Sequence, residues 1–253
     1  MRDIQGMSVL ITGGGSGLGA GTARHFAERG ARVTICGRRA DKIAEVAADI
    51  GAACLAVTGD ITIAGDRERI VAEAARHGGG LQALINNAGN MYRGPIATLT
   101  QEMLRGIFDV NVISGMLLTG LAVPLLAKTG GAVIFVGSVH TRRAFPGASP
   151  YAATKGAVET LTKVLAAELG EKKICVNCVV PGAVFTEINQ RAGLFDDETA
   201  RKRLGGMASL HALGRIGTAT EIAEAIAYLC CAEWTTGAVV DVDGGLGLGI
   251  TAG

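Results

Sequence analysis

Short apolar runs alternate with amphipathic segments along the whole of this 253-residue chain, and this alternation restricts the fold more than any other feature. The amphipathic segments, among them 19–29, 39–49 and 151–169, have the three-to-four-residue periodicity of helices. The predicted strands are 8–12, 32–36, 53–57, 83–87, 132–136, 175–180 and 238–242. Repeated β-α-β units with right-handed crossovers predict an α/β fold, a doubly wound parallel sheet of about seven strands with helices on both faces. A closed barrel of about eight strands is the alternative.

The composition is that of a globular protein. Hydrophobic residues make up 49% and charged residues 19%, and the length suits one large domain, 1–253, better than two small ones. The net charge is +1 and Lys and Arg form no long run, which argues against nucleic acid as a partner. Without an apolar leader or ~20 uninterrupted apolar residues, we expect neither secretion nor a membrane span, and a cytoplasmic location.

Two of the six cysteines, Cys175 and Cys178, form a C-x-x-C motif, which occurs in redox pairs and in zinc sites. Their surroundings, ICVNCVV, are typical of a buried strand, in which residues three apart point to opposite faces. No second C-x-x-C or nearby histidine completes a set of metal ligands. We therefore expect reduced, structural thiols and no metal site.

The first apolar run leads into a glycine-rich turn from Thr12 to Gly19 (TGGGSGLG) and then into a helical segment from Ala20. Glycine allows a sharp turn and lets backbone N–H groups approach a diphosphate, and the N-terminus of the following helix adds partial positive charge. A purely structural turn is the alternative. The position between the first strand and the first helix favours dinucleotide binding, and a Rossmann-like sheet over the barrel.

The end of the second strand indicates which dinucleotide is bound. NAD sites of this type place an acidic residue there, about 20 residues past the glycines, where it bonds the ribose 2′-hydroxyl. Here no acid occurs until Asp41, which we expect inside the following helix. Gly37 leaves room, Arg38 offers a planar fork suited to phosphate, and Arg39 is a second candidate. We predict NADP(H) rather than NAD(H); the alternative is that both arginines are ordinary solvated residues.

Tyr151 and Lys155 lie four residues apart on a predicted helix, so their side chains share one face. A nearby ammonium lowers the pKa of a phenol by ~1–3 units and brings it closer to the range of general acid–base catalysis. The spacing alone is common. It gains weight because Ser138 follows the strand 132–136 at its carboxyl end and Asn111 lies in the preceding long helical segment.

These residues together resemble the short-chain dehydrogenase/reductase family, in its compact single-domain branch, over almost the whole chain. The motifs that carry the resemblance are the TGxxxGxG turn, Asp60, the segment Asn86-Asn87-Ala88-Gly89, Asn111, Ser138, Tyr151, Lys155, Pro181-Gly182, Thr186 and Asp243-Gly244-Gly245. The resemblance implies an oxidoreductase that moves a hydride between a nicotinamide and a ketone or secondary alcohol. It also implies a homotetramer, or a homodimer, that uses the helices containing Asn111 and Tyr151, and often the region of the last strand.

The resemblance implies a role for each catalytic residue. Tyr151 resembles the acid that protonates the carbonyl oxygen in reduction, and Ser138 the residue that hydrogen-bonds this oxygen. Lys155 would lower the pKa of the tyrosine and hold the nicotinamide ribose, and Asn111 would position a water molecule. A structural kink at Asn111 is the alternative.

The implied cofactor contacts include Asp60 at the adenine and Thr186 at the nicotinamide end. For both residues the alternative is a local turn or helix cap. The full predicted cofactor set is Gly13, Gly15, Ser16, Gly17, Leu18, Gly19, Gly37, Arg38, Arg39, Asp60, Ile61, Asn87, Ala88, Gly89, Tyr151, Lys155, Pro181, Gly182, Val184 and Thr186.

Three positions depart from the family pattern. Cys175 stands where the family often has Arg, and Gly137 stands where it often has Ser, which we expect to enlarge the pocket slightly. Ser16 stands where many NADP-preferring relatives place a basic residue, so Arg38 must act without that second cation.

The expected substrate contacts lie between Ser138 and Tyr151 and after Gly89; they are Met91, Tyr92, His140, Arg142, Arg143 and Phe145. The two arginines could recognise an anionic group, or lie in solvent or at a subunit contact. The polar segment 186–217 is either a substrate lid or a solvated helical hairpin. The preferred function is a carbonyl reductase or 3-oxoacyl reductase-like enzyme; the alternatives are an NAD-dependent alcohol or sugar dehydrogenase and, more distantly, a non-catalytic dinucleotide sensor.

Overall fold

In the part of the chain that the computed structural model describes, residues 1–188 and 196–249, the strands form one open parallel sheet in the order β3-β2-β1-β4-β5-β6-β7. This order confirms the doubly wound, Rossmann-like arrangement and excludes the closed barrel. The strands are β1 (Ser8–Thr12), β2 (Arg32–Gly37), β3 (Cys54–Thr58), β4 (Ala83–Asn86), β5 (Ala132–Val136), β6 (Cys175–Pro181) and β7 (Val239–Val242). No strand end differs by more than one residue from the apolar run that predicted it.

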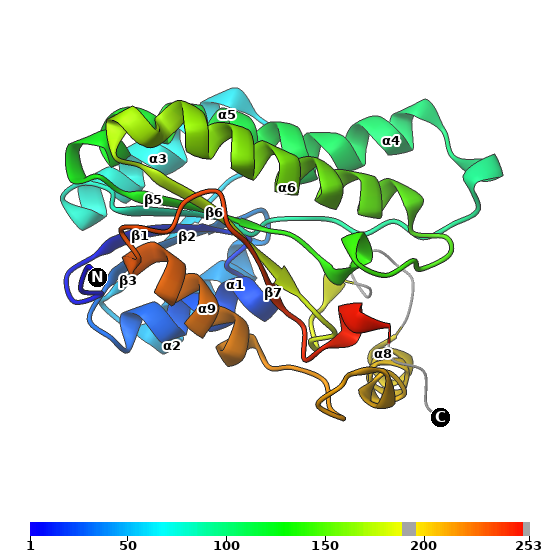
Figure 1. Cartoon of the computed structure of the whole chain (residues 1–253). Helices are drawn as coiled ribbons and strands as arrows, with labels where there is room; N and C mark the ends of the chain where they lie inside the picture. Colours follow the sequence, from blue (N-terminus) through cyan, green and yellow to red (C-terminus); the bar gives the residue numbers. More distant parts are fainter. Residues whose placement is uncertain (189–195, 250–253) are drawn as a thin grey trace.

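Helices cover both faces of this sheet (Figure 1). The helices are α1 (Gly17–Ala27), α2 (Ala40–Ile50), α3 (Ala64–Gly78), α4 (Gln101–Phe108), α5 (Ser114–Thr129), α6 (Ser149–Leu169), α8 (Asp197–Gly205) and α9 (Ala219–Cys231). Short 3-10 turns are η1 (Ile96–Thr98), η3 (Val139–Thr141), η4 (Gly170–Lys172), η5 (Ala208–Leu210) and η6 (Leu246–Leu248). Helices α1, α2 and α9 pack on one face, and α3, α5 and α6 pack on the other.

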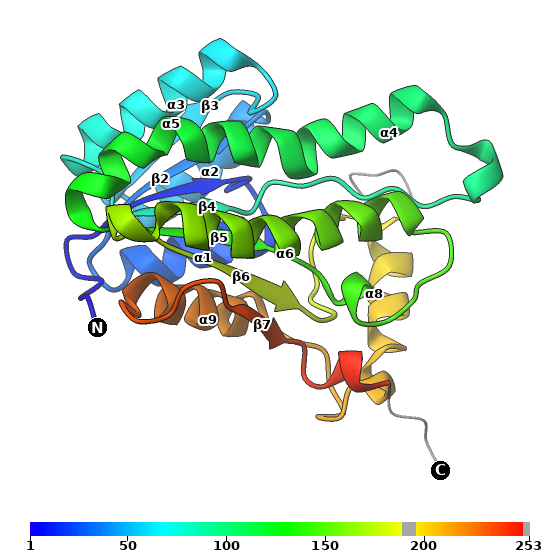
Figure 2. The same ribbon diagram turned by 45° about the horizontal axis from the view of Figure 1, so that its top comes forward.

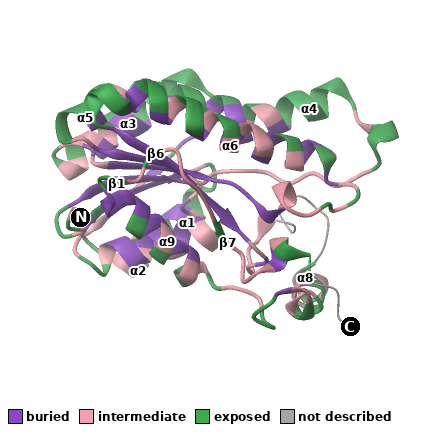
Figure 3. Cartoon of the chain, viewed as in Figure 1, coloured by how far each residue is buried: buried purple, intermediate pink, exposed green. Residues whose placement is uncertain are grey.

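The inner strands are largely apolar because both of their faces are buried, and β1, β5 and β6 are buried at every residue. The edge strands β3 and β7 are only partly buried. In β1, Val9 and Ile11 pack with residues of α1 and α9, whereas Leu10 between them packs with residues of α3 and α5. Figure 3 shows the buried strands between helices whose outer sides are exposed. The low aromatic content therefore suits a sheet that is covered closely by small and branched side chains.

The strand order reverses beside β1, which pairs with β2 on one side and with β4 on the other. Connections from β1 and β4 leave toward opposite faces of the sheet, so a crevice opens at the carboxyl ends of these strands. Ligands bind at such a switch point in open α/β sheets. The glycine turn after β1 and the segments after β4, β5 and β6 all meet there.

Helices α4 and α5 are continuous through a widened, π-helical turn (η2, Asp109–Ile113) and run beside α6 (Figure 2). The whole helix, Gln101–Thr129, is long and apolar enough to cross a membrane, and its most apolar stretch has a mean hydropathy of 1.9. However, 44% of that stretch is buried inside the protein. Its outer side exposes Met116, Leu117 and Leu121. The sequence scan for uninterrupted apolar residues missed this helix, because glycine, serine and threonine interrupt its apolar positions.

Cys175 and Cys178 lie in β6, a strand buried along its whole length, as predicted. All six cysteines are free thiols, and burial raises the pKa of Cys178 to about 12. A buried thiol with a raised pKa is a poor nucleophile and a poor metal ligand. The motif therefore belongs to the packing of the sheet.

Candidate active site

The glycine turn follows β1 directly, and its glycines are required by contacts as well as by conformation. Gly13 has φ +70° and Gly17 has φ +53°, and α1 already begins at Gly17 rather than at Ala20. A Cβ atom at Gly13 would lie 3.0 Å from Ala88 Cα, and one at Gly19 would lie 2.3 Å from the carbonyl oxygen of Gly13. The N-terminus of α1 therefore faces the crevice with no side chain between it and an incoming diphosphate.

The turn is tied to the end of β4 by hydrogen bonds. The hydroxyl of Thr12 accepts hydrogen bonds from the backbone N–H groups of Asn87, at 3.0 Å, and Ala88, at 2.9 Å. The side-chain amide of Asn87 donates to the carbonyl oxygen of Thr12 at 2.8 Å. The two segments that flank the switch point are thus held as one rigid cradle, which fits a dinucleotide.

Near the carboxyl ends of β2 and β3, Gly37, Arg38 and Asp60 line the wall of the crevice together. Arg38 Nη1 lies 3.7 Å from Asp60 Oδ2. Asp60 also accepts from the backbone N–H of Thr62 at 2.9 Å, so it caps a turn as well as facing the crevice. Asp41 lies inside α2, as expected, and no acid stands at the end of β2.

Arg39 points to a different place from Arg38. Its Nη2 donates to Ser16 Oγ at 3.2 Å and to Glu187 Oε2 at 2.8 Å. Arg39 therefore joins the glycine turn to the start of the predicted lid, and Glu187 is a cleft residue that the sequence reasoning missed. No motif marked this acid, because its partner lies 148 residues away in the sequence.

The structure places most of the predicted cofactor set on one cleft and leaves four of the predicted site residues off its lining: Gly15, Gly19, Arg39 and Asn111. Gly15 backs onto α2, where an added Cβ would lie 3.2 Å from Ile43 Cγ2. Gly19 packs against the carbonyl of Gly13, as described above. These two glycines shape the turn from behind.

Ser138, Tyr151 and Lys155 meet at the carboxyl end of β5. Ser138 follows β5 and begins η3, and α6 places Tyr151 and Lys155 on the same side, facing the cleft. Lys155 Nζ donates to the carbonyl oxygen of Val136 at 2.7 Å and lies 5.5 Å from the centre of the Tyr151 ring. Burial lowers the pKa of Lys155 to about 8.

The pKa of the Tyr151 phenol differs from the sequence-based expectation, which was a value lowered by Lys155. Burial raises this pKa, while a hydrogen bond with Ser138 and the charge of Arg93 act in the opposite direction. The expectation was wrong because it counted the attraction of a nearby cation and omitted desolvation of the phenolate. Lys155 is itself desolvated and directs its ammonium at a backbone carbonyl.

Asn111 lies in the π-helical turn between α4 and α5 and is buried behind the cleft. Its Oδ1 accepts from the N–H of Asn90 at 2.8 Å, and its Nδ2 donates to the carbonyl of Asn90 and to Thr154 Oγ1, each at 3.0 Å. A Cβ atom at Gly89 would lie 3.3 Å from this amide. The Asn111 side chain thus fixes the segment after β4 to α6, which agrees with the structural alternative for this residue.

Among the expected substrate contacts, Met91, His140 and Phe145 line the cleft, whereas Tyr92, Arg142 and Arg143 do not. Arg93, which the sequence reasoning passed over, does line it. A lone arginine four residues past Gly89 belongs to no motif of the chain, so no sequence signal marked it. From the predicted lid, Leu204 and Met207 also reach the cleft; residues 189–195 of this segment lie outside the described part.

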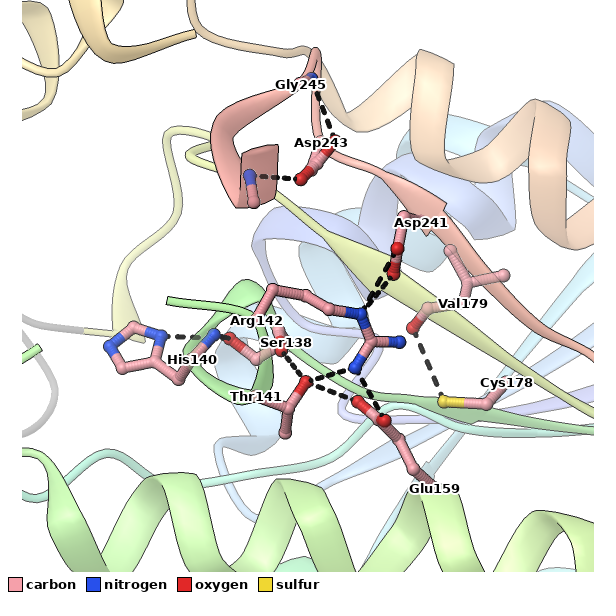
Figure 4. A network of polar contacts seen from close by, with 11 residues as sticks. Ser138, His140, Thr141, Arg142, Glu159, Cys178, Val179, Asp241, Asp243 and Gly245 are labelled. Atoms are coloured by element: carbon pink, nitrogen blue, oxygen red, sulfur yellow. Dashed lines mark hydrogen bonds and ion pairs between the residues drawn. The ribbon is translucent and has the colours of Figure 1, made fainter. Parts of the chain in front are cut away.

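Arg142 does not line the cleft and takes part in a network of polar contacts beside it (Figure 4). Its Nη1 donates to Glu159 Oε2 at 2.8 Å and its Nε donates to Asp241 at 3.0 Å. Thr141 Oγ1 donates to the carbonyl oxygen of Ser138 at 2.8 Å. The network clamps the turn after Ser138 to α6 and β7, which argues against the first of the alternatives given for Arg142, recognition of an anionic substrate group.

At Gly137 we expected a slightly larger pocket, and the structure differs from this expectation. A Cβ atom at Gly137 would lie 3.0 Å from both Cys178 Sγ and Val180 Cγ2, two neighbours in β6. A side chain at this position would therefore press on the sheet. Gly137 accommodates Cys178 and adds no room for substrate.

Comparisons with known proteins agree with this geometry. A family model described as enoyl-(acyl carrier protein) reductase matches residues 13–247. A glucose 1-dehydrogenase of Gluconobacter oxydans is 37% identical over 96% of this chain and 92% of its own length. The dehydrogenase/reductase SDR family member 4 of Sus scrofa is 34% identical over 96% of this chain and 88% of its own length.

A solved structure, the 3-ketoacyl-(acyl-carrier-protein) reductase of Brucella melitensis complexed with NADH, matches with a TM-score of 0.89 and 34% identity. The match covers 97% of this chain and all of that one. Sequence identity at this level over nearly the full length indicates common ancestry, because proteins that share only the fold are less similar in sequence. The chain belongs to the short-chain dehydrogenase/reductase family and is an NAD(P)-dependent oxidoreductase that acts on CH–OH groups.

Proposed function

We propose that this enzyme uses NADP(H) to interconvert a ketone and a secondary alcohol, as a carbonyl reductase or a 3-oxoacyl reductase-like enzyme. The observation that carries the coenzyme preference is the end of β2, where Gly37 and Arg38 line the cleft and no carboxylate is present. An acid at this position would repel a 2′-phosphate, whereas a guanidinium binds one. Ser16, which also lines the cleft, adds a hydroxyl group nearby.

The chemistry follows from the three residues at the end of β5. The nicotinamide supplies the hydride in reduction and accepts it in oxidation. Tyr151 keeps its proton at neutral pH because burial raises its pKa, so it is ready to protonate a carbonyl oxygen. Ser138 lies against the phenol and holds it in place by a hydrogen bond. Lys155 carries its charge below its pKa of about 8 and stabilises the developing negative charge around the phenol.

The coenzyme proposal is tested by measuring kcat/KM with NADPH and with NADH for one ketone. We expect NADPH to be preferred, and Arg38→Asp to shift the ratio toward NADH by about 10- to 100-fold through the loss of a charge-assisted contact. Arg32→Asp is a matched control, since Arg32 is exposed at the opposite, amino end of β2. A clear preference of the unmodified enzyme for NADH refutes the coenzyme proposal.

The second candidate is an NAD-dependent alcohol or sugar dehydrogenase. It is favoured by the NADH in the Brucella reductase and by the glucose dehydrogenase activity in the name of the Gluconobacter relative. Oxidation of an aldose or a simple secondary alcohol with NAD, faster than reduction of any ketone with NADPH, would select this candidate.

We also propose a homotetramer and a lid. The exposed apolar side of the Gln101–Thr129 helix, with Val164 on the neighbouring α6, supports a subunit interface. Leu204 and Met207 support closure of the 186–217 segment over the substrate, because both line the cleft from α8 and the turn after it. Light scattering at working concentration measures the assembly; a monomer would refute the first part.

A further inference from the structure

Arg93 is a charged residue in the catalytic part of the cleft that the reaction described above does not use. It lines the cleft, and its Nε is buried without a hydrogen-bond partner among the described residues. Its charge acts on Tyr151 and lowers the pKa of the phenol, which places Arg93 near the catalytic residues. A buried donor without a partner costs free energy unless a ligand supplies an acceptor.

His140 presents a second donor to the same space. Its Nδ1 lies 3.0 Å from Ser138 Oγ, and its ring lies edge-on to Tyr151 with centroids 5.0 Å apart. Burial, with the charges of Arg93 and Lys155, lowers the pKa of His140 to about 4, so the ring is neutral at neutral pH. In the tautomer whose Nδ1 accepts from Ser138, Nε2 is a donor, and this atom is also buried and unpartnered among the described residues.

The charges around these two donors have one sign. Arg203, on α8, is a second cation whose charge acts on Arg93. Among the described residues that line the cleft, the acids are Asp60, beside Arg38, and Glu187, beside Arg39. Four apolar residues also line this cleft: Met91, Phe145, Leu204 and Met207. A ligand that binds both Arg93 and His140 needs hydrogen-bond acceptors for these two donors. A carboxylate offers two acceptor oxygens in a planar arrangement that matches a guanidinium.

We propose that the substrate is an oxo acid or the corresponding hydroxy acid, whose carboxylate binds Arg93 and His140 while its carbonyl oxygen accepts a hydrogen bond from Tyr151; the Ser138 proton is engaged by His140 in this arrangement. This inference rests on the proposed oxidoreductase function and specifies its substrate class. It replaces the sequence-based anion site at Arg142 and Arg143 with one built on residues that reach the cleft.

The test compares α-, β- and γ-oxo acids with their methyl esters, using NADPH and NADH, because an ester keeps the shape of the acid and loses its charge. The measured quantity is the ratio of kcat/KM for acid and ester within one variant, so that a general loss of activity cancels. For the best-fitting chain length we expect a ratio of about 10 to 100, the range of one charge-assisted contact. Arg93→Gln should bring the ratio close to one, and Arg93→Lys should restore part of it.

Arg105→Gln is the matched control; Arg105 is exposed on α4 and should keep the wild-type ratio. Equal efficiency for acids and esters in the wild type would overturn the carboxylate site and leave the oxidoreductase function intact. No turnover of any acid, ester or alcohol, with coenzyme still bound, would overturn both. A loss of NADPH affinity in Arg93→Gln as large as the loss of acid preference would assign Arg93 to the coenzyme and overturn the inference.

Discussion

Arg142 and Arg143 are adjacent in sequence, yet the structure gives them opposite surroundings, and substitution of each by methionine tests this difference. Arg142 forms ion pairs with Glu159 and Asp241, and 25% of its own side chain is exposed. Arg143 has no side-chain hydrogen bond or ion pair with any described residue, and its Nη1 is buried without a partner. The two variants remove the same charge from neighbouring positions and differ only in the partners left behind.

The loss in Arg142→Met is dominated by Glu159, whose side chain is 14% exposed. Leaving a buried charge without its partner costs about 3–5 kcal/mol. Asp241 is 45% exposed, so its contact adds at most about 1 kcal/mol. Allowing for the residual exposure of Glu159, we expect a loss of about 3 kcal/mol, which lowers Tm by roughly 6–12 °C in a chain of this length. Arg143→Met should change stability by less than about 1 kcal/mol.

Differential scanning calorimetry at equal protein concentration measures both variants, since assembly makes Tm depend on concentration. Arg142→Met should also lower kcat, because the clamp fixes the turn that carries Ser138; Arg143→Met should lack this effect. Equal Tm shifts in the two variants, or a shift below about 2 °C for Arg142→Met, would refute the account of the clamp.

Three further outcomes follow from the site. Tyr151→Phe should lower kcat by about 10²- to 10⁴-fold while a fluorescence titration shows unchanged NAD(P)H binding; near-normal turnover would remove Tyr151 from the proton transfer. The kcat/KM for ketone reduction should fall as the pH rises through about 8, where the Lys155 ammonium is lost, whereas a flat profile to higher pH would contradict the lowered pKa. The folded-state pKa of His140, about 4, lies below its ordinary value of 6.5, so the unfolded chain binds the extra proton between these values and stability declines as the pH falls through this window. Urea denaturation should show this decline, about 2 kcal/mol by pH ~5; His140→Phe should lack it, and an equal decline in that variant would assign it to other groups.

The fold was predictable because its inner strands are buried on both faces, so that each consists of a nearly continuous run of apolar residues. The run of β5 and that of β1 match the structure at both ends. The glycine turn was predictable for a similar reason: its residues are constrained by local backbone conformation, as the positive φ of Gly13 and Gly17 shows. Features set by neighbours in sequence, or by burial on both sides, leave a pattern that can be found without a structure.

The electrostatics of the site could not be predicted in the same way. The pKa of Tyr151 depends on how much solvent its ring loses and on Arg93, which approaches it from another part of the chain. Arg142 and Arg143 have the same chemistry and differ only in what surrounds them. Similarly, Glu187 meets Arg39 although 148 residues separate them in the sequence. The role of a charged side chain depends on partners that are distant in the sequence, and a single sequence does not show which residues pair.

The widened turn at Asp109–Ile113 makes room for one more residue than a regular helix would hold there. Asn111 lies in this turn, and its amide binds both Asn90 and Thr154. Deleting one residue from the turn would restore a regular ladder of hydrogen bonds, but it would withdraw Asn111 from these partners. The backbone irregularity is thus exchanged for a side-chain bridge between the segment after β4 and α6, and a more regular helix would leave that segment without its anchor.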